Sequence, residues 1–283
     1  MLGRCLRRVV VCDIGEQRNR RSRAMHGYLT GDGAAPADFY RTAREELRRY
    51  DTVELCHINV TDALREPDGF RVICSDGTQL RARTLLLATG VVDELPPIEG
   101  LTELYGTSVH HCPYCDGWEW RGQPVAIYGS GESGVALALG LTRWTGDLVL
   151  CTGQADGLPD GGESRLAAAG IAVRHEPVLR LEGQGGWLER VVFAEGPPLE
   201  RRALFFCSGQ RQRSPLAAKL GCRFTEKGAV ATGKCEATNV PGLYVAGDAS
   251  KDAQFVVVAV SEGAEAGMAI NQALLRNDVK EQR

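Results

Sequence analysis

Short apolar runs alternate with amphipathic patterns of helical period along this 283-residue chain, which is the order expected of an α/β protein. The apolar runs predict buried strands, and the amphipathic stretches predict helices. The predicted strands span residues 8–13, 84–90, 124–128, 148–151, 171–175, 188–194, 203–208 and 243–248. The predicted helices span residues 36–50, 135–143 and 261–275.

A second kind of strand pattern lies between residues 53 and 81. Residues 53–60, 70–75 and 79–81 predict antiparallel strands, with Asp76-Gly77 as a hairpin turn. Residues 91–100 contain two prolines and predict a linker. We therefore expect a second domain to begin after this linker.

Composition excludes two classes of partner. A net charge of −3 provides no basic field for nucleic acid or anionic lipid. The longest apolar run, residues 255–260, is far shorter than the roughly 20 residues of a membrane span. The N-terminal arginines precede too short an apolar stretch for a signal peptide, because Asp13 ends it. The sequence therefore predicts a cytoplasmic protein, and most of its ten cysteines are scattered as in reduced, buried thiols.

The cysteines that stand apart are Cys112 and Cys115, which are followed by Asp116. Two cysteines at this spacing can close a small disulfide ring, and an adjacent acid can give or take a proton. The alternative is half of a zinc site completed by His110 and His111. Zinc ranks lower because no second Cys-x-x-Cys or His-x-x-x-His occurs in the sequence. On the first interpretation, the two histidines are a polar lead-in to the motif.

A glycine pattern follows the predicted strand at residues 124–128. Gly129, Gly131 and Gly134 open a predicted helix, and this context makes them a candidate pyrophosphate cradle. The next strand ends at Cys151 and is followed by Thr152-Gly153-Gln154. Neither the acid that favours NAD nor the basic residues that favour NADP occur there, so the coenzyme stays open.

Two aspartates follow apolar strands and have two interpretations each. Asp13 stands where a dinucleotide fold holds an adenosine ribose, and a strand-end acid facing solvent is an equal alternative. Asp248 follows Gly247 at another strand end, where a turn residue is the preferred interpretation of the residues alone.

Residues 8–13 and 147–152 have the pattern of one strand repeated in two βαβ units. The second copy has its glycine loop upstream, whereas the same spacing places the equivalent loop of the first copy before Met1. We therefore expect the first unit to lack its central strand and pyrophosphate loop, which would leave two unpaired strand edges.

Together these motifs resemble the low-molecular-weight thioredoxin reductases and thioredoxin reductase-like relatives among the pyridine nucleotide-disulfide oxidoreductases. The resemblance lies in Cys112-Pro113-Tyr114-Cys115-Asp116-Gly117, the turn Ala88-Thr89-Gly90 before it, the glycine loop after it and residues 243–248. It implies two Rossmann-like, three-layer α/β domains. Residues 1–109 and 235–283 would form a split FAD domain, and residues 110–234 would form an inserted NAD(P) domain that carries the cysteines.

The resemblance also implies roles for individual residues. Cys115 would lie against the flavin and accept electrons, Cys112 would attack a substrate disulfide, and Asp116 would serve as acid and base. FAD, and NADPH or NADH, would be the cofactors, with no metal. The implied cofactor-binding residues are Asp13, Ala88, Thr89, Gly90, Gly129, Gly131, Gly134, Gly247, Asp248 and Gln254.

The family's basic cluster for the NADP 2′-phosphate has no equivalent after Cys151. This departure gives weight to a second hypothesis, a small-molecule dithiol oxidase like those that close gliotoxin and holomycin with oxygen. A third hypothesis is an inactive copy that no longer binds FAD. The resemblance implies a homodimer and a thioredoxin-like protein or small dithiol or disulfide as partner, and the sequence does not name which.

Overall fold

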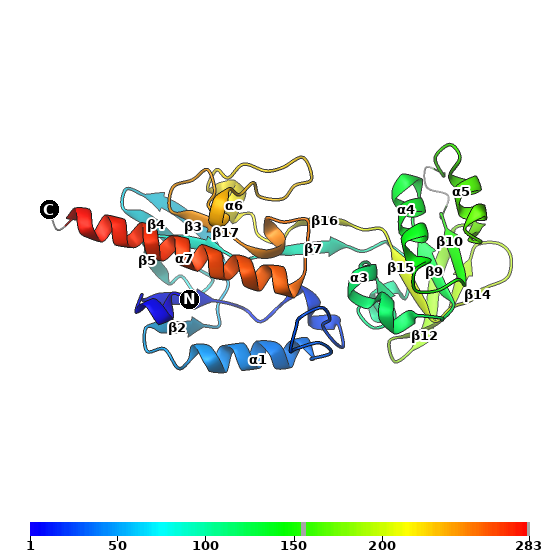
Figure 1. The fold of residues 1–283 in the computed structure, drawn as a ribbon, viewed down its shortest axis with the longest axis horizontal. Coiled ribbons are helices and arrows are strands. Elements are labelled where there is room, and N and C mark those ends of the chain that lie inside the picture. The colour runs from blue at the N-terminus through cyan, green and yellow to red at the C-terminus, as the bar shows by residue number, and fades with distance from the viewer. Residues whose placement is uncertain (154–156, 282–283) are drawn as a thin grey trace. The chain divides into compact units, whose positions relative to one another are not determined.

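The computed structural model describes residues 1–153 and 157–281, which form two compact units (Figure 1). Unit 1 comprises Met1–Arg20, Gly27–Val92 and Gln210–Arg283, and unit 2 comprises Arg21–His26 and Asp93–Gly209. Besides the short excursion of Arg21–His26 into unit 2, the chain passes from one unit to the other in β7 (Val91–Glu94) and β16 (Gly209–Gln212), which pair with each other.

The units are bounded by different residues from the predicted domain ranges. Residues 93–109 pack with unit 2, and residues 210–234 pack with unit 1. The assignment of a cofactor to each domain stays a prediction.

Unit 2 is organised around a five-stranded sheet with the order β11-β10-β9-β15-β8. All its strand pairs are parallel. Because β9 is central and the chain turns outward on both sides of it, the carboxyl end of β9 lies at the switch point where such sheets bind ligands. The elements of unit 2 are α2 (Leu101–Leu104), β8 (Val109–His110), α3 (Pro113–Asp116), η3 (Gly117–Trp120), β9 (Val125–Tyr128), α4 (Gly131–Leu141), β10 (Leu148–Cys151), α5 (Gly162–Ala168), β11 (Ala172–Arg174), β12 (Val178–Gln184), β13 (Trp187–Phe193), β14 (Leu199–Glu200) and β15 (Ala203–Phe206).

Alternating side chains of β9 explain the three layers of unit 2. Val125 and Ile127 pack in one core with residues of α4 and α5, and both helices are drawn beside the sheet in Figure 1. Ala126 points the other way, into a core shared with the antiparallel sheet β12-β13-β14. All three residues are fully buried, as expected of a parallel strand covered on both faces.

Unit 1 repeats this layering with shorter sheets. Leu243 and Val245 of β17 pack against the antiparallel sheet β3-β4-β5, whereas Tyr244 packs against Ile270 and Leu274 of α7. The elements of unit 1 are η1 (Gly3–Cys5), β1 (Val9–Cys12), α1 (Pro36–Leu47), β2 (Val53–Cys56), β3 (Val60–Glu66), β4 (Gly69–Cys74), β5 (Gln79–Ala82), β6 (Leu85–Leu87), α6 (Leu216–Lys219), η4 (Lys234–Glu236), β17 (Leu243–Val245), η5 (Gly247–Ala249) and α7 (Val256–Glu281). One further element, η2 (Arg18–Arg21), spans the boundary between the units.

The parallel strands of unit 1 form two separate pairs, β1-β2 and β17-β6. The prediction of one antiparallel strand over residues 53–60 is therefore wrong. Val53–Cys56 pairs parallel with β1, and a new strand begins at Val60 and pairs antiparallel with β4. The continuous pattern of apolar residues concealed this break, because both strands are apolar on one side.

The C-terminal helix is longer than predicted, since α7 already begins at Val256. The run 255–260 contains four valines, which are weak helix formers. The helix was therefore predicted to begin after this run. Even so, no helix in residues 1–153 and 157–281 is both long and apolar enough to cross a membrane.

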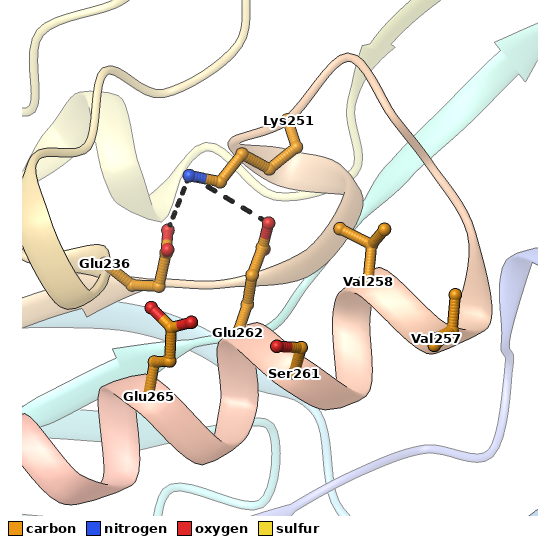
Figure 2. Close-up of a pocket in the computed structure, with 7 residues that line it drawn as sticks. All are labelled: Glu236, Lys251, Val257, Val258, Ser261, Glu262 and Glu265. Carbon is orange, nitrogen blue, oxygen red and sulfur yellow. Dashed lines mark ion pairs between the residues drawn. The ribbon is translucent and has the colours of Figure 1, made fainter.

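A buried ionic cluster fixes the loop between β17 and the first turns of α7. Glu262 Oε2 accepts a hydrogen bond from the Gly247 backbone N–H at 2.6 Å. Lys251 Nζ lies 3.1 Å from Glu236 and 3.9 Å from Glu262 (Figure 2). These side chains line a pocket of about 400 Å³ together with Ser261 and Glu265. The cluster therefore holds the Gly247 loop against the helix that follows it.

Candidate functional site

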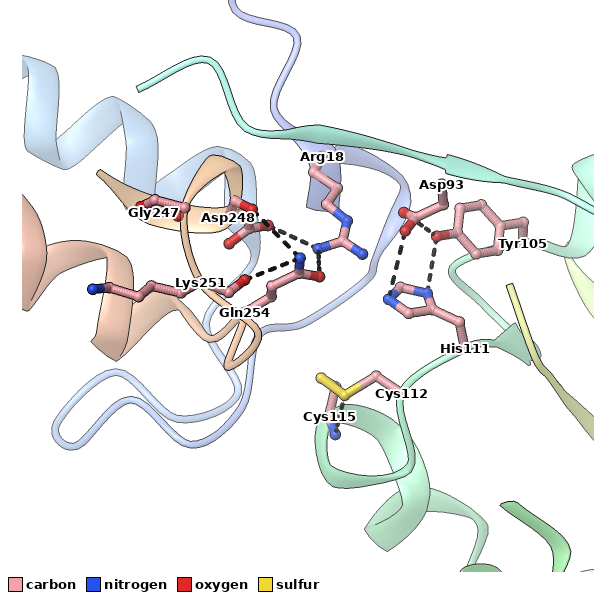
Figure 3. Close-up of polar contacts among 11 residues, drawn as sticks. Arg18, Asp93, Tyr105, His111, Cys112, Cys115, Gly247, Asp248, Lys251 and Gln254 are labelled. Atoms are coloured by element: carbon pink, nitrogen blue, oxygen red, sulfur yellow. Dashed lines mark hydrogen bonds and ion pairs between the residues drawn. A yellow bond between two sulfur atoms is a disulfide. The ribbon is translucent and has the colours of Figure 1, made fainter. Parts of the chain in front are cut away.

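Cys112 and Cys115 form a disulfide in unit 2 (Figure 3). Cys112 is the N-cap of the short helix α3, and Pro113 follows at its first position, where a missing N–H costs no hydrogen bond. The Cys115 backbone N–H donates to Cys112 Sγ at 3.1 Å. Both cysteines are half-buried. A backbone donor aimed at Cys112 Sγ stabilises a thiolate there once the disulfide opens, which favours Cys112 as the attacking sulfur.

The remaining eight cysteines are free thiols. Cys74, Cys151 and Cys222 are buried, whereas Cys5 is exposed. The expectation that the scattered cysteines are mostly buried is therefore only partly correct. Burial raises the pKa of Cys151 to about 12 and that of Cys12 to about 11, so both thiols stay protonated and unreactive near neutral pH.

His110 orients Asp116. The His110 side chain is 5% exposed, and Trp120 Nε1 donates to its Nε2 at 3.0 Å. Because an indole nitrogen only donates, Nε2 carries a lone pair and the proton of the neutral ring lies on Nδ1. Nδ1 faces Asp116 Oδ1 at 3.3 Å. The ring therefore points its N–H at the carboxylate of Asp116 and holds it beside the disulfide loop.

His111 has different partners. The Tyr105 hydroxyl donates to Asp93 Oδ2 at 2.9 Å and lies 3.1 Å from His111 Nδ1 (Figure 3). Since the single hydroxyl hydrogen goes to Asp93, the Tyr105 oxygen accepts from Nδ1–H. The Asp93 side chain is only 5% exposed. His110 thus belongs to a buried hydrogen-bond chain and His111 to a part-buried one, so both histidines have specific partners and are more than a polar lead-in.

The alternative of a zinc site gains no support from this geometry. His110 and His111 point to carboxylates, an indole and a phenol, and the cysteine sulfurs are bonded to each other. Among the residues that the structure describes, no group of three His, Cys, Asp or Glu side chains could hold a metal ion.

The glycine pattern of unit 2 forms a tight turn between β9 and α4. A Cβ on Gly134 would lie 2.7 Å from the Gly129 carbonyl carbon, and one on Gly129 would lie 2.9 Å from Cys207 Sγ. These glycines let the helix approach the strand. Gly131 differs, because it has φ +58° and a Cβ there would meet no atom within 4 Å. Its open side, at the carboxyl end of β9, is a cradle that a side chain would fill, and it fits a dinucleotide pyrophosphate.

Two basic residues, Arg174 at the end of β11 and His175 after it, lie next to the end of β10. Cys151 is paired with Arg174, and His175 Nδ1 lies 3.3 Å from Thr152 Oγ1. Arg174 binds both oxygens of Glu176, and His175 Nε2 lies 3.1 Å from Glu163. A 2′-phosphate would have to displace these glutamates to reach the bases. Gln154, the last residue of the expected coenzyme segment, lies outside the described residues.

In unit 1, two predicted cofactor-binding segments leave neighbouring strands. Leu87 of β6 is paired with Val245 of β17. The turn Ala88-Thr89-Gly90 and the pair Gly247-Asp248 therefore start side by side at the carboxyl ends of parallel strands.

Gln254 belongs to the same loop, since its Nε2 donates to the Asp248 carbonyl at 3.4 Å. Asp13 ends β1, where its Oδ1 accepts from the Gly15 N–H at 2.9 Å and its Oδ2 lies 3.1 Å from Arg44. Tyr40 of α1 lies near both acids: burial and then the charges of Asp248 and Asp13 raise its pKa. The structure thus brings these predicted residues to one edge of unit 1.

Sequence reasoning missed Arg18 and Asn19, which lie in the short helix η2 within a polar segment that has no recognisable motif. Arg18 Nη1 donates to Asp248 Oδ2 at 2.8 Å and to Gln254 Oε1 at 2.6 Å (Figure 3). Asn19 Oδ1 is buried and has no hydrogen-bond partner in the described part of the chain. Buried acceptors normally have a donor, so a donor from a bound polar ligand would satisfy Asn19 Oδ1. A flavin has such donors, and these residues therefore fit it.

One unit contains a closed Cys-x-x-Cys disulfide and a glycine turn after a central parallel strand, and the other is a second parallel α/β unit. This combination is typical of a disulfide-handling oxidoreductase. Comparisons with known proteins agree. Residues 2–263 match the family model described as pyridine nucleotide-disulphide oxidoreductase. The chain therefore belongs to this family.

Individual relatives support the same assignment. The solved structure of HlmI is 34% identical, with a TM-score of 0.93, and the match covers 99% of this chain and 89% of that one. Thioredoxin reductase tcpT of Claviceps purpurea is 30% identical, covering 94% of this chain and 86% of that protein. Thioredoxin reductase sirT of Leptosphaeria maculans is 29% identical, covering 98% and 90%. The prediction of two Rossmann-like α/β domains is confirmed.

Proposed function

We propose that this chain is an FAD-dependent thiol-disulfide oxidoreductase of thioredoxin reductase type. It passes electrons from NADPH or NADH, through FAD and then Cys112 and Cys115, to a disulfide. The observation that carries the proposal is the closed Cys112–Cys115 disulfide, flanked by Asp116 and held in the unit that contains the glycine turn. The names of the relatives tcpT and sirT support it.

FAD supplies two electrons to the chain when it is bound. Two electrons and one proton open the Cys112–Cys115 bond. The products are a thiolate at Cys112 and a thiol at Cys115. The Cys112 thiolate attacks one sulfur of the substrate disulfide, and the other sulfur leaves and takes a proton. Cys115 loses its proton to Asp116 and attacks Cys112 Sγ, which restores the disulfide. The second substrate sulfur leaves and takes this proton from Asp116, so it is released as a thiol. One disulfide, two electrons and two protons thus give two thiols.

The cofactor-binding residues stay as predicted from the sequence. FAD would lie against Asp13, the turn Ala88-Thr89-Gly90 and the Gly247-Asp248-Gln254 loop. The nicotinamide coenzyme would lie on the Gly129 to Gly134 turn. We also propose that the protein is cytoplasmic and that it forms a homodimer. Light scattering of the purified protein, which measures its molar mass, tests the homodimer.

A small-molecule dithiol oxidase is the second candidate. One observation favours it: Arg174 and His175, the basic residues described at the β10 end beside Thr152, are each paired with a glutamate. Tyr114, between the two cysteines, is 79% exposed, and Trp118 is 64% exposed. Exposed aromatic surface of this kind suits a flat, apolar dithiol and a protein alike, so it is compatible with both candidates.

An anaerobic titration separates the candidates. The purified chain is mixed with FAD, and its absorption spectrum is followed while NADPH, NADH or a dithiol is added. Bleaching by NADPH or NADH supports the reductase and names its coenzyme. Bleaching by dithiols alone, with peroxide formed in air, supports the oxidase. A chain that binds no FAD contradicts both.

Cysteine variants test the electron path in the chain. C112S and C115S should each lower turnover of oxidised thioredoxin and of lipoamide by about 1000-fold or more, because each removes a bond-forming sulfur. C115S should also trap a mixed disulfide on Cys112, visible by mass spectrometry. C5S, which changes an exposed free cysteine, is the control and should leave turnover unchanged. Full turnover by C112S would contradict the proposal.

A further inference from the structure

Arg18 joins the two side chains on which the proposed flavin site depends. One of its nitrogens, Nη1, bridges Asp248 Oδ2 and Gln254 Oε1 at 2.8 and 2.6 Å. The Arg18 side chain is 17% exposed and that of Asp248 is 21% exposed. These charge-assisted contacts are therefore made largely out of water, where they are strong and directional.

The bridge holds the side chain of Gln254 against that of Asp248 within one loop. Gln254 lies six residues beyond Asp248, and its amide Nε2 donates to the Asp248 and Lys251 carbonyls at 3.4 Å. Arg18 reaches this loop from a segment that is 230 residues away in sequence. Without that contact, Gln254 Oε1 would lose the shortest hydrogen bond recorded for its side chain.

Charge balance gives Arg18 a second role. Tyr40 experiences the negative charges of both Asp248 and Asp13. Arg44 pairs with Asp13, and Arg18 pairs with Asp248. If Arg18 were neutral, Asp248 would be left as an uncompensated, mostly buried carboxylate. Such a charge repels the pyrophosphate of FAD and opposes the negative charge that a flavin gains on reduction.

We propose that Arg18 is a positioning residue of the flavin site, which holds Asp248 and Gln254 in place and neutralises Asp248. The buried Asn19 Oδ1 beside it, which has no partner in the described residues, is an acceptor for a ligand N–H or O–H and supports a ligand at this position. The inference rests on the proposed function, since it requires a flavin.

The test compares FAD dissociation constants and flavin midpoint potentials of wild type, R18Q, R18K and the double variant R18Q/D248N. R20Q is the matched control, because Arg20 lies in the same short helix, is exposed and carries the same charge. R18Q should bind FAD about 10- to 100-fold more weakly, because it loses the two charge-assisted hydrogen bonds that hold Asp248 and Gln254 in place. Its potential should fall by about 30 mV for each tenfold loss of preference for reduced over oxidised flavin.

The other variants separate charge from geometry. R18K keeps the charge and should keep the wild-type potential while binding FAD more weakly. R18Q/D248N restores neutrality and should recover the potential, but not the affinity. R20Q should match wild type in both measurements.

The outcomes distinguish this inference from the function on which it rests. If wild type binds FAD and R18Q matches R20Q in affinity and potential, the role of Arg18 is overturned. If wild type binds no FAD, the proposed function fails instead. Circular dichroism of each variant checks folding, and if R18Q does not fold, a lowered potential in R18K would overturn the role of its charge.

Discussion

At the scale of single residues, the role of His110 depends on Trp120. The indole N–H occupies Nε2 and so directs the Nδ1 proton at Asp116. In W120F most of the apolar surface stays, but the buried Nε2 loses its donor. We expect a loss of about 1–3 kcal/mol in the free energy of unfolding. We also expect the ring to leave the single Nδ1–H tautomer, which ¹⁵N chemical shifts of the imidazole would report.

W118F is the control for this prediction. Trp118 is in the same short helix, but it is 64% exposed and Arg121 stacks on its ring. It should change neither the tautomer nor the stability by more than about 0.5 kcal/mol. A His110 imidazole with the same ¹⁵N shifts in W120F and wild type would show that the indole does not select the tautomer.

Glu262 predicts a pH effect on stability. Burial, followed by the charges of Glu236 and Asp248, raises its pKa against the opposing effects of the Gly247 N–H and Lys251. The folded state therefore binds more protons than the unfolded state over a window that starts near the ordinary value of 4.5. This contribution to stability is present below the window and is lost as the pH rises through it.

E262Q tests this sign, since glutamine keeps an acceptor for the Gly247 N–H and cannot ionise. The stability of E262Q relative to wild type should increase as the pH rises from about 4.5 to 7 in urea unfolding series. E265Q, at an exposed glutamate of the same pocket, should show no such trend. A difference between E262Q and wild type that does not vary with pH would contradict the assignment.

Sequence alone could identify the residues whose chemistry depends on short spacing. Cys112, Cys115 and Asp116 are of this kind, and the structure gives the expected disulfide. Arg18 could not be identified, because Asp248 lies 230 residues away and only the fold brings the two together. Asp93 lies only 12 residues from Tyr105, but no motif marks this spacing.

At the scale of elements, the turn between β9 and α4 requires glycine for two different reasons. Gly134 packs closely against Gly129, whereas Gly131 has a positive φ. In G134A the new Cβ would lie 2.7 and 2.8 Å from backbone atoms of Gly129, which must then move. We expect a loss of about 1–3 kcal/mol in stability from this overpacking. In G131A the Cβ has space, but φ is +58°, so strain should cost about 1–2 kcal/mol.

Nucleotide binding should distinguish the two variants further. G131A places a methyl group in the open side of the turn and should weaken NADPH or NADH binding, measured by fluorescence titration, beyond its effect on stability. G140A is the control on α4, where a Cβ meets nothing within 4 Å. It should stabilise the protein by about 0.5–1 kcal/mol and leave binding unchanged. Equal binding by G131A and G140A would argue against a pyrophosphate at this turn.

Elements with a clear pattern of apolar residues could be predicted from the sequence. Strands that depend on pairing with a neighbouring strand could not. The buried strand of residues 124–128 and the helix after it are found as predicted, because the apolar run and the glycine turn are local features. Val178–Gln184 was missed as a strand, since Leu181 is its single buried apolar residue and two register shifts interrupt its pairing with β13. Its conformation is set by the strand it pairs with.

At the scale of the whole molecule, both units use one scheme. In each, a parallel layer lies between a helical layer and an antiparallel three-stranded sheet, as the cores of β9 and β17 show. The α/β class follows from the sequence for this reason: both faces of the parallel strands are buried, so their apolar runs are continuous. The division of unit 1 into three stretches of chain is not visible in any local pattern.

Asp278 ties together distant parts of unit 1 at the last turns of α7. Its carboxylate accepts hydrogen bonds from Arg7, near the N-terminus, and from Arg83, just before β6. These hydrogen bonds lower the pKa of Asp278 below the ordinary 3.8. The unfolded state therefore binds more protons, so the stabilising contribution is present above pH 3.8 and is lost as the pH falls through the lowered value.

D278N tests whether this link contributes to the fold as a whole. Urea unfolding should show D278N to be less stable than wild type near neutral pH, with the difference shrinking towards pH 2, where wild type also loses the charge. Arg7 should keep its second contact, Asn271, so the N-terminal segment should stay docked in D278N. D252N breaks a pair with Lys227 whose side chains are both mostly exposed, and it should show almost no effect. A D278N deficit that is the same at both pH values would place the contribution in packing at this position and not in its charge.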